Sequence, residues 1–215
     1  QIMLISHKHQ FIFVHLHRTG GISTKQALKV SAPDTKPLAG IHDFACVGKA
    51  LLPLEWNQYF TFAFIRNPWD RLVSSYFKAC GIGEKLTPSE RSSHRNKLLR
   101  MVWERANSFE DFLYHCTDKV LDHLGPRSYA FNQLDYITDK DGKVIVDFVG
   151  QFENLRIDFA KVAKQVQIPT DLPFHSNTSE HFHYSFYYTP ETEELVKKRF
   201  QKDIDFFGYT FIKEK

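Results

Sequence analysis

A short buried strand that turns directly into a helix occurs twice in this chain, and this repeat constrains the fold more than any other sequence feature. Residues 11–16 are a short β-branched and aromatic run, with His15 the one polar residue, as expected of a buried strand, and Gly20-Gly21 follows shortly after. A helix is expected over about residues 23–30. Residues 59–65 predict a second buried strand, after which Asn67-Pro68 is typical of a helix start.

Further strands and helices alternate along the chain. Residues 144–149 predict a third strand, and residues 155–166 have the apolar spacing of an amphipathic helix. Helices are also expected to begin at Ser108 and at Thr189. Alternation of this kind favours an α/β fold. We expect one domain over residues 1–215, a three-layer sandwich with a central, mainly parallel sheet.

Composition excludes several classes of protein. The chain has 215 residues, 28 Lys and Arg against 25 Asp and Glu, and 42% hydrophobic residues, which excludes disordered, collagen-like and coiled-coil chains. Its apolar runs are far shorter than the roughly 20 residues that a membrane span needs. The excess of positive charge is too small to indicate nucleic-acid binding.

The cysteines and histidines carry no metal or disulfide pattern. Three widely spaced cysteines favour neither a disulfide framework nor a zinc site, and a reducing compartment is the default expectation. Pairs such as His181 and His183 alternate as strand residues do, yet no Cys, Asp or Glu accompanies them at ligand spacing. We therefore expect no metal site.

The segment after the first strand has the features of an anion site. Glycines let the backbone approach a ligand closely, and N–H groups and the helix dipole supply positive potential there. Arg18 adds a cation. The segment is not a Walker A loop, because the spacing and the lysine of that motif are missing. A glycine-containing turn without a ligand is the alternative. Hydroxyl groups in the segment come from Thr19, Ser23 and Thr24.

A second anion site is expected where the second strand ends. Arg66 leaves that strand at the carboxyl edge of the sheet, where open α/β folds bind ligands. Ser74 lies on the polar face of the next helix. A guanidinium with a hydroxyl suits a terminal phosphate. Arg71 either contacts the ligand or pairs with a carboxylate such as Asp70. Two anion sites suggest a ligand with two phosphates.

Together the two motifs resemble those of the PAPS-dependent sulfotransferases, PAPS being 3′-phosphoadenosine 5′-phosphosulfate. The carbohydrate-type branch, which includes heparan sulfate 2-O-sulfotransferase and bacterial relatives, has a loop that commonly reads H-I-P-K-T-G-G-T-S and a second motif R-N-P-x-x-R-L-V-S-x-Y. Residues 66–76 match the second motif throughout. Residues 146–155 and 187–211 also resemble the family, so the resemblance covers about residues 11–212.

The resemblance implies a P-loop-like sulfotransferase fold and transfer of a sulfo group to an acceptor hydroxyl, with a carbohydrate as the expected acceptor. It implies PAPS as co-substrate, 3′-phosphoadenosine 5′-phosphate (PAP) as product, and no metal. Arg66 and Ser74 would bind the 3′-phosphate, and Arg18 would also be catalytic. The 5′-phosphosulfate would be bound by the loop residues Arg18, Thr19, Gly20, Gly21, Ile22, Ser23 and Thr24.

The acceptor needs a base, and His42 lies where this branch carries its catalytic histidine. An unperturbed imidazole can accept an alcohol proton at neutral pH. A hydrogen-bonded surface role is the alternative for His42. The family usually has lysine where this chain has Arg18, and arginine is a poor proton donor. A catalytically silent binding relative therefore stays open, as does a nucleotide kinase-like phosphotransferase.

Residues 81–105 are charged and lack apolar spacing until residues 98–103. This pattern suggests a mobile loop leading into a helix, and we expect a lid or an acceptor-binding insertion. Its basic side chains would suit an anionic glycan, or they form an ordinary solvated helix face. The three unpatterned cysteines and the compact length favour a bacterial cytoplasmic enzyme. The chain begins at Gln1 without Met, so a Golgi enzyme whose anchor was removed is the alternative. The basic residues are Arg91, Arg95, Lys97, Arg100 and Arg105.

Overall fold

The computed structural model describes residues 3–38, 44–122, 125–169 and 181–214. Contacts divide the chain into two units, which we call the sheet unit and the helical unit. The sheet unit comprises Gln1–Arg66 and Gln133–Thr178, and the helical unit comprises Asn67–Asn132 and Ser179–Lys215. The chain first passes from one unit to the other directly after Arg66, the arginine of the second predicted anion site.

The sheet unit contains the expected mainly parallel sheet. Three neighbouring strands of the sheet, β2, β4 and β7, are parallel to one another, whereas β1 runs antiparallel to both β2 and β3. Both strand–helix repeats predicted from the sequence are present, with β2 and β4 as their strands. In order across the sheet, the strands are β3 (Lys36–Pro37), β1 (Leu4–Ser6), β2 (Phe11–Val14), β4 (Phe60–Ile65) and β7 (Phe148–Gln151).

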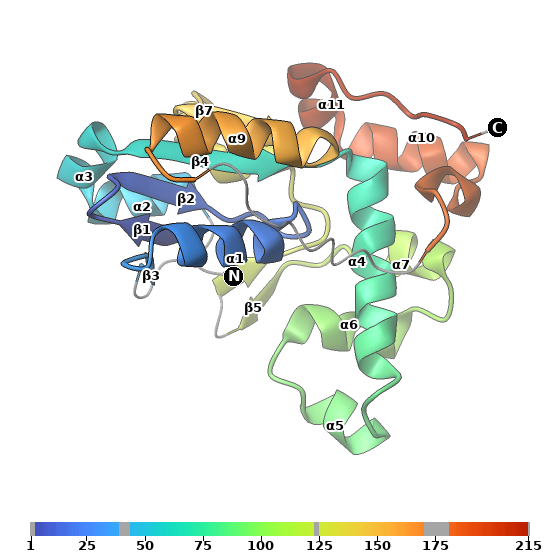
Figure 1. Ribbon diagram of the computed structural model, residues 1–215. Helices are drawn as coiled ribbons and strands as arrows, with labels where there is room; N and C mark the ends of the chain where they lie inside the picture. The colour runs from blue at the N-terminus through green and yellow to red at the C-terminus, as the bar shows by residue number, and fades with distance from the viewer. Residues whose placement is uncertain (1–2, 39–43, 123–124, 170–180, 215) are drawn as a thin grey trace. The chain divides into compact units, whose positions relative to one another are not determined.

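Helices cover both faces of this sheet. Helices α1 (Gly21–Ser31) and α9 (Leu155–Gln165) lie on the same face (Figure 1), and their apolar residues share one core with alternate residues of β2 and β4. Helix α2 (Ala45–Leu51) lies on the other face, where Gly48 packs against Met3 and the Trp56 ring of α3 (Pro53–Gln58). The predicted layered α/β arrangement is confirmed.

Aromatic residues fill the core of the sheet unit. Phe11, Phe13, Phe62 and Phe64 are fully buried, and the rings of Phe13 and Phe62 are stacked with their centroids 5.1 Å apart. The residues between them in β2 and β4 are buried as well, because both faces of the sheet are covered. This explains why β2 is apolar throughout and why β4 has Thr61 as its single polar residue, instead of an alternation of apolar and polar residues.

The third strand begins later than the sequence predicts. The sequence predicts it over residues 144–149, but β7 starts at Phe148, and Val144 forms only an isolated bridge with Thr138. The carboxylate of Asp147 accepts hydrogen bonds from the backbone N and the Oγ1 of Thr61, at 2.8 and 2.9 Å. The Asp147 side chain therefore binds the Thr61 N–H, the backbone donor of β4 at this position. Regular pairing of β7 with β4 starts one residue later, at Phe148.

The helical unit contains most of the remaining elements. Its longest helix, α4 (Pro68–Gly83), begins where Asn67-Pro68 predicted it, and the Oδ1 of Asn67 accepts from the Trp69 N at 3.1 Å. Ser108 and Thr189 also cap helices as predicted. The other elements are α5 (Pro88–Ser93), α6 (Lys97–Arg105), α7 (Phe109–His115), the hairpin of β5 (Val120–Asp122) and β6 (Gly125–Arg127), the short helix η2 (Tyr184–Tyr187), α10 (Pro190–Arg199) and α11 (Gln201–Phe207).

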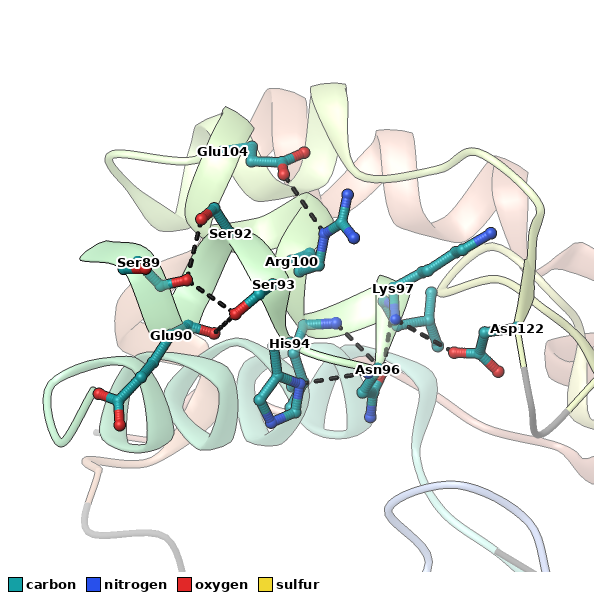
Figure 2. A network of polar contacts seen from close by, with 12 residues as sticks. Ser89, Glu90, Ser92, Ser93, His94, Asn96, Lys97, Arg100, Glu104 and Asp122 are labelled. Carbon is teal, nitrogen blue, oxygen red and sulfur yellow. Dashed lines mark hydrogen bonds and ion pairs between the residues drawn. The ribbon is translucent and has the colours of Figure 1, made fainter. Parts of the chain in front are cut away.

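The expected insertion at residues 81–105 contains more helix than the sequence predicts. The helix expected at its end is α6, but the charged stretch before it contains α5, whose Thr87 and Glu90 form a capping box. Figure 2 shows the polar contacts that follow: Asn96 caps α6, and the backbone N of Lys97 donates to Asp122 of the hairpin at 3.1 Å. Helix α6 is thereby tied to β5.

Candidate functional site

The first predicted anion site lies at the carboxyl edge of the sheet. Strands β2 and β4 are parallel, with Val14 opposite Ala63, so the chain leaves both strands at the same edge. The loop of residues 15–20 joins β2 to α1 there, and Arg66 directly follows β4. Ligands of open α/β sheets bind at this edge.

The loop backbone is shaped for close approach by a ligand. Gly20 has a φ of 80° and is the N-cap of α1, and Arg18 has a φ of 66°, which is uncommon for a residue with a side chain. Such backbone conformations cluster at functional sites. The first turn of α1 carries no acidic residue. The positive end of the α1 dipole is therefore not offset by a carboxylate of its own first turn, which suits an anion.

Both glycines of the loop are packed so closely that a Cβ would overlap neighbouring side chains. A Cβ on Gly20 would lie 2.7 Å from Leu155 Cδ2 and 3.0 Å from the Phe152 ring. A Cβ on Gly21 would lie 1.7 Å from Nε2 and 2.1 Å from Cδ2 of His15, and would therefore overlap the imidazole ring. The ring of His15 and the segment that starts α9 thus support the loop from the protein side.

His15 is a buried, neutral support of the loop. Its ring is stacked on Phe13, with the centroids 5.6 Å apart. Burial, together with positive charges that include Lys25, lowers the pKa of His15 from 6.5 to about 3. The imidazole is therefore uncharged near neutral pH. It contributes shape to the loop and no positive charge.

Arg66 joins the two predicted anion motifs inside the sheet unit. Its guanidinium Nη1 donates a hydrogen bond to the backbone O of Arg18 at 3.3 Å. The amide of Gln133 binds both backbone groups of Arg66: Arg66 N donates to Oε1 at 2.8 Å, and Nε2 donates to Arg66 O at 2.7 Å. The Arg66 Cζ lies over the Phe152 ring, 4.1 Å from its centroid. Arg66 is thus fixed at both backbone and side chain.

The sequence did not single out Gln133 or Phe152. Gln133 begins α8 (Gln133–Ile137), 67 positions after Arg66, and no local pattern marks an amide that pairs with a distant backbone. Phe152 falls within the stretch that resembles the sulfotransferases, but the motif alone assigns it no role. Both residues are recognised only from their contacts with Arg66.

The other loop residues that the sequence proposed lie together on one strand–helix turn. The hydroxyl of Thr19 donates to the Leu16 O at 3.1 Å, and the hydroxyl of Thr24 donates to the Gly20 O at 3.2 Å. These two hydroxyl protons therefore stabilise the loop itself. Ser23 is buried, whereas the Ile22 side chain is exposed.

Three further residues that the sequence predicts as ligand contacts or as catalytic lie outside the loop. Ser74 is buried within α4 of the helical unit. Arg71 donates to the Phe131 O at 2.8 Å and lies over the Phe200 ring, so these contacts hold the helical unit together. His42 lies outside the described residues.

The basic side chains of residues 91–105 are partly engaged in ion pairs. Arg100 Nε lies 3.5 Å from a Glu104 carboxylate oxygen, and Arg105 Nη1 lies 2.6 Å from an Asp118 carboxylate oxygen. Neutralisation of these two cations favours an ordinary solvated helix face over a surface built for an anionic glycan.

Two general features of the described part of the chain bear on function. Among the residues with described positions, no group of three or more His, Cys, Asp or Glu side chains is arranged to hold a metal ion. None of the described helices is long and apolar enough to cross a membrane.

Comparison with known proteins identifies the family. The sulfotransferase family model matches residues 1–210, so the chain belongs to the sulfotransferase family. The fold, a mainly parallel sheet flanked by helices, agrees with this membership. An uncharacterized protein of Archaeoglobus fulgidus is 30% identical over 133 residues, which are 62% of this chain and 85% of that protein. No solved structure matches the chain.

Proposed function

We propose that this sulfotransferase moves the sulfo group of PAPS to a hydroxyl group of a carbohydrate acceptor. The observation that carries the proposal is the hydrogen bond from Arg66 to the Arg18 backbone, which joins two cationic motifs at the carboxyl ends of adjacent parallel strands. A donor with a 5′-phosphosulfate and a 3′-phosphate needs two such motifs. The family supports sulfo transfer in general, and the motif match supports PAPS as the donor.

The loop residues suit the 5′-phosphosulfate. Gly20 and Gly21 allow close approach, the backbone N–H groups at the start of α1 are donors, and Arg18 supplies charge. In this proposal residues 18–24 bind the phosphosulfate. Arg66 binds the 3′-phosphate with Ser74, whose assignment rests on the motif alone.

The proposed reaction is an in-line displacement at sulfur. The acceptor oxygen forms the new S–O bond while the bond from sulfur to the bridging oxygen of the 5′-phosphate breaks. His42 takes the acceptor proton, and Arg18 with the loop N–H groups stabilises the charge on the leaving oxygen. No metal is invoked. Orientation and fixed positive charge account for the acceleration, as in phosphoryl transfer.

The donor site is tested first by ligand-induced stabilisation. A ligand that binds only the folded chain raises its melting temperature. We expect PAP to raise the melting temperature more than AMP, which lacks the 3′-phosphate, and more than ATP with magnesium. A larger shift with ATP and magnesium would contradict the proposal and favour a kinase-like phosphotransferase.

The catalytic assignment is tested with His42→Ala. This variant is expected to bind PAP as the wild type does and to lose transfer from PAPS to a panel of carbohydrate acceptors by about 10²–10⁴-fold, the usual contribution of a general base. Undiminished transfer would remove His42 from the mechanism. A wild-type chain that binds PAP and sulfates no acceptor would instead indicate the catalytically silent relative, which the arginine at position 18 keeps open.

A further inference from the structure

Phe152 contacts both anion motifs of the sheet unit. Its ring lies beneath the Arg66 guanidinium, with 4.1 Å between Cζ and the ring centroid. The same ring packs against the loop, because a Cβ on Gly20 would lie 3.0 Å from Phe152 Cδ2. One side chain therefore touches the loop proposed for the 5′-phosphosulfate and the arginine proposed for the 3′-phosphate.

The chemistry of these contacts suits orientation of a cation. An aromatic face attracts a guanidinium through the ring quadrupole, and this attraction consumes none of the N–H donors of the arginine. One Arg66 donor reaches the Arg18 O, and Gln133 fixes the backbone. The Phe152 ring beneath the Arg66 guanidinium limits the remaining motion of that guanidinium. The N–H edge of the guanidinium then keeps a fixed direction for hydrogen bonding.

The position of Phe152 in the chain explains how it is held. It follows the last residue of β7 and starts the short helix η1 (Phe152–Asn154), which leads into α9. Gln151 N donates to the Asp158 carboxylate of α9 at 2.8 Å, which fixes the backbone directly before Phe152. The backbone at Phe152 is therefore held by β7 on one side and by α9 on the other.

We propose that Phe152 is a positioning residue that holds the phosphosulfate loop and Arg66 in register, so that the two phosphates of the donor are bound together. This inference rests on the proposed function. The inference assigns a role to Phe152, a residue to which the sequence motifs assign none. Phe152 acts through Gly20 and Arg66, and is not itself a catalytic residue.

The test compares Phe152→Leu with Phe148→Leu. Leucine keeps apolar volume but removes the aromatic face. Phe148 is a matched control because it is also partly buried in the same segment, and its ring neighbours Phe60 instead of Arg66. For Phe152→Leu we expect PAP affinity to fall about tenfold, as for loss of a partly desolvated cation–π contact. The affinity of Phe152→Leu for AMP should fall as well, because the loop proposed for the 5′-phosphate loses the support of the ring. Arg66→Lys should lower the affinity for PAP alone, because AMP has no 3′-phosphate.

A ligand-free measurement separates this inference from the proposed function. In the wild type the Arg66 Nε–H resonance, assigned with Arg66→Lys, should show the ring-current shift of a group above an aromatic face. That shift should vanish in Phe152→Leu and persist in Phe148→Leu. An unchanged resonance, or equal losses of PAP affinity in both leucine variants, would overturn the inference. If the wild type binds no nucleotide, the proposed function fails, and the resonance alone decides whether Phe152 orients Arg66.

Discussion

At the scale of single residues, the loop between β2 and α1 depends on two glycines for different reasons. Gly20 has a left-handed backbone, with a φ of 80°, and the Phe152 ring leaves no space for a side chain there. Gly21 needs the absence of a side chain, because the His15 ring fills the space where a Cβ would stand. The loop shape is therefore set by packing as well as by backbone freedom.

Gly21→Ala tests this packing. The methyl group would overlap the buried His15 ring, which is stacked on Phe13, so we expect a loss of about 1–3 kcal/mol in unfolding free energy, typical of an overpacked core. Urea denaturation measures the change. Gly81→Ala in α4 is the matched control, because its Cβ meets no atom within 4 Å, and it should leave stability unchanged or raise it by up to about 1 kcal/mol. Equal stability of the two variants would contradict the His15 contact.

At the scale of secondary-structure elements, side chains at helix ends connect separate parts of the helical unit. Asn96 accepts from two N–H groups at the start of α6, and its Oδ1 also accepts from Arg127 of β6 at 3.0 Å. Arg127 in turn pairs with Asp122 of β5, and both side chains are nearly inaccessible, at 4% and 2% exposure. This buried ion pair therefore holds the hairpin closed. The hairpin is bound to α6 by hydrogen bonds, one of them from the Lys97 N to Asp122 (Figure 2).

Asp122→Ala is expected to destabilise the helical unit by about 3–5 kcal/mol, because Arg127 would remain buried without its carboxylate. Asp118→Ala is the matched control. It removes the carboxylate of the Arg105 pair, whose side chains are 44% and 61% exposed, and should cost at most about 1 kcal/mol. Urea unfolding followed by circular dichroism compares the two variants. Similar costs would show that the Asp122–Arg127 pair is not desolvated.

At the scale of the whole molecule, burial of a titratable group makes stability depend on pH. The pKa of His15 is lowered to about 3 by burial, whereas the unfolded chain has the ordinary value of 6.5. Between these values the unfolded chain binds a proton that the folded chain does not. The contribution of neutral His15 is therefore complete above pH 6.5 and is lost progressively as the pH falls toward 3.

The expected slope is up to about 1.4 kcal/mol of unfolding free energy per pH unit within this window. Urea midpoints at several pH values between about 7 and about 4 should fall more steeply for the wild type than for His15→Gln, which has no titrating ring. Other titratable groups contribute equally to the pH dependence of both proteins, so their contributions cancel in the difference between wild type and His15→Gln. Parallel curves would mean that His15 is protonated in the folded chain.

The sequence predicted the elements whose signals are local. Apolar runs marked β2 and β4, and Asn67, Ser108 and Thr189 marked helix starts, because a strand between covered faces and a capped helix have short-range patterns. It missed β1, β3 and the β5–β6 hairpin. These strands have two or three residues, too few for a periodic signal, and partners across the sheet or hairpin decide that they pair.

The sequence by itself determined the family motifs, the two strand–helix turns and the type of charge at each, since these depend on residue types at fixed spacing. Only the tertiary structure decided that Arg66 bonds to Arg18, that Gln133 clamps the Arg66 backbone and that Phe152 lies beneath its guanidinium. Such contacts join residues 48 to 86 positions apart, and their geometry follows from strand register and helix packing, which no local pattern encodes.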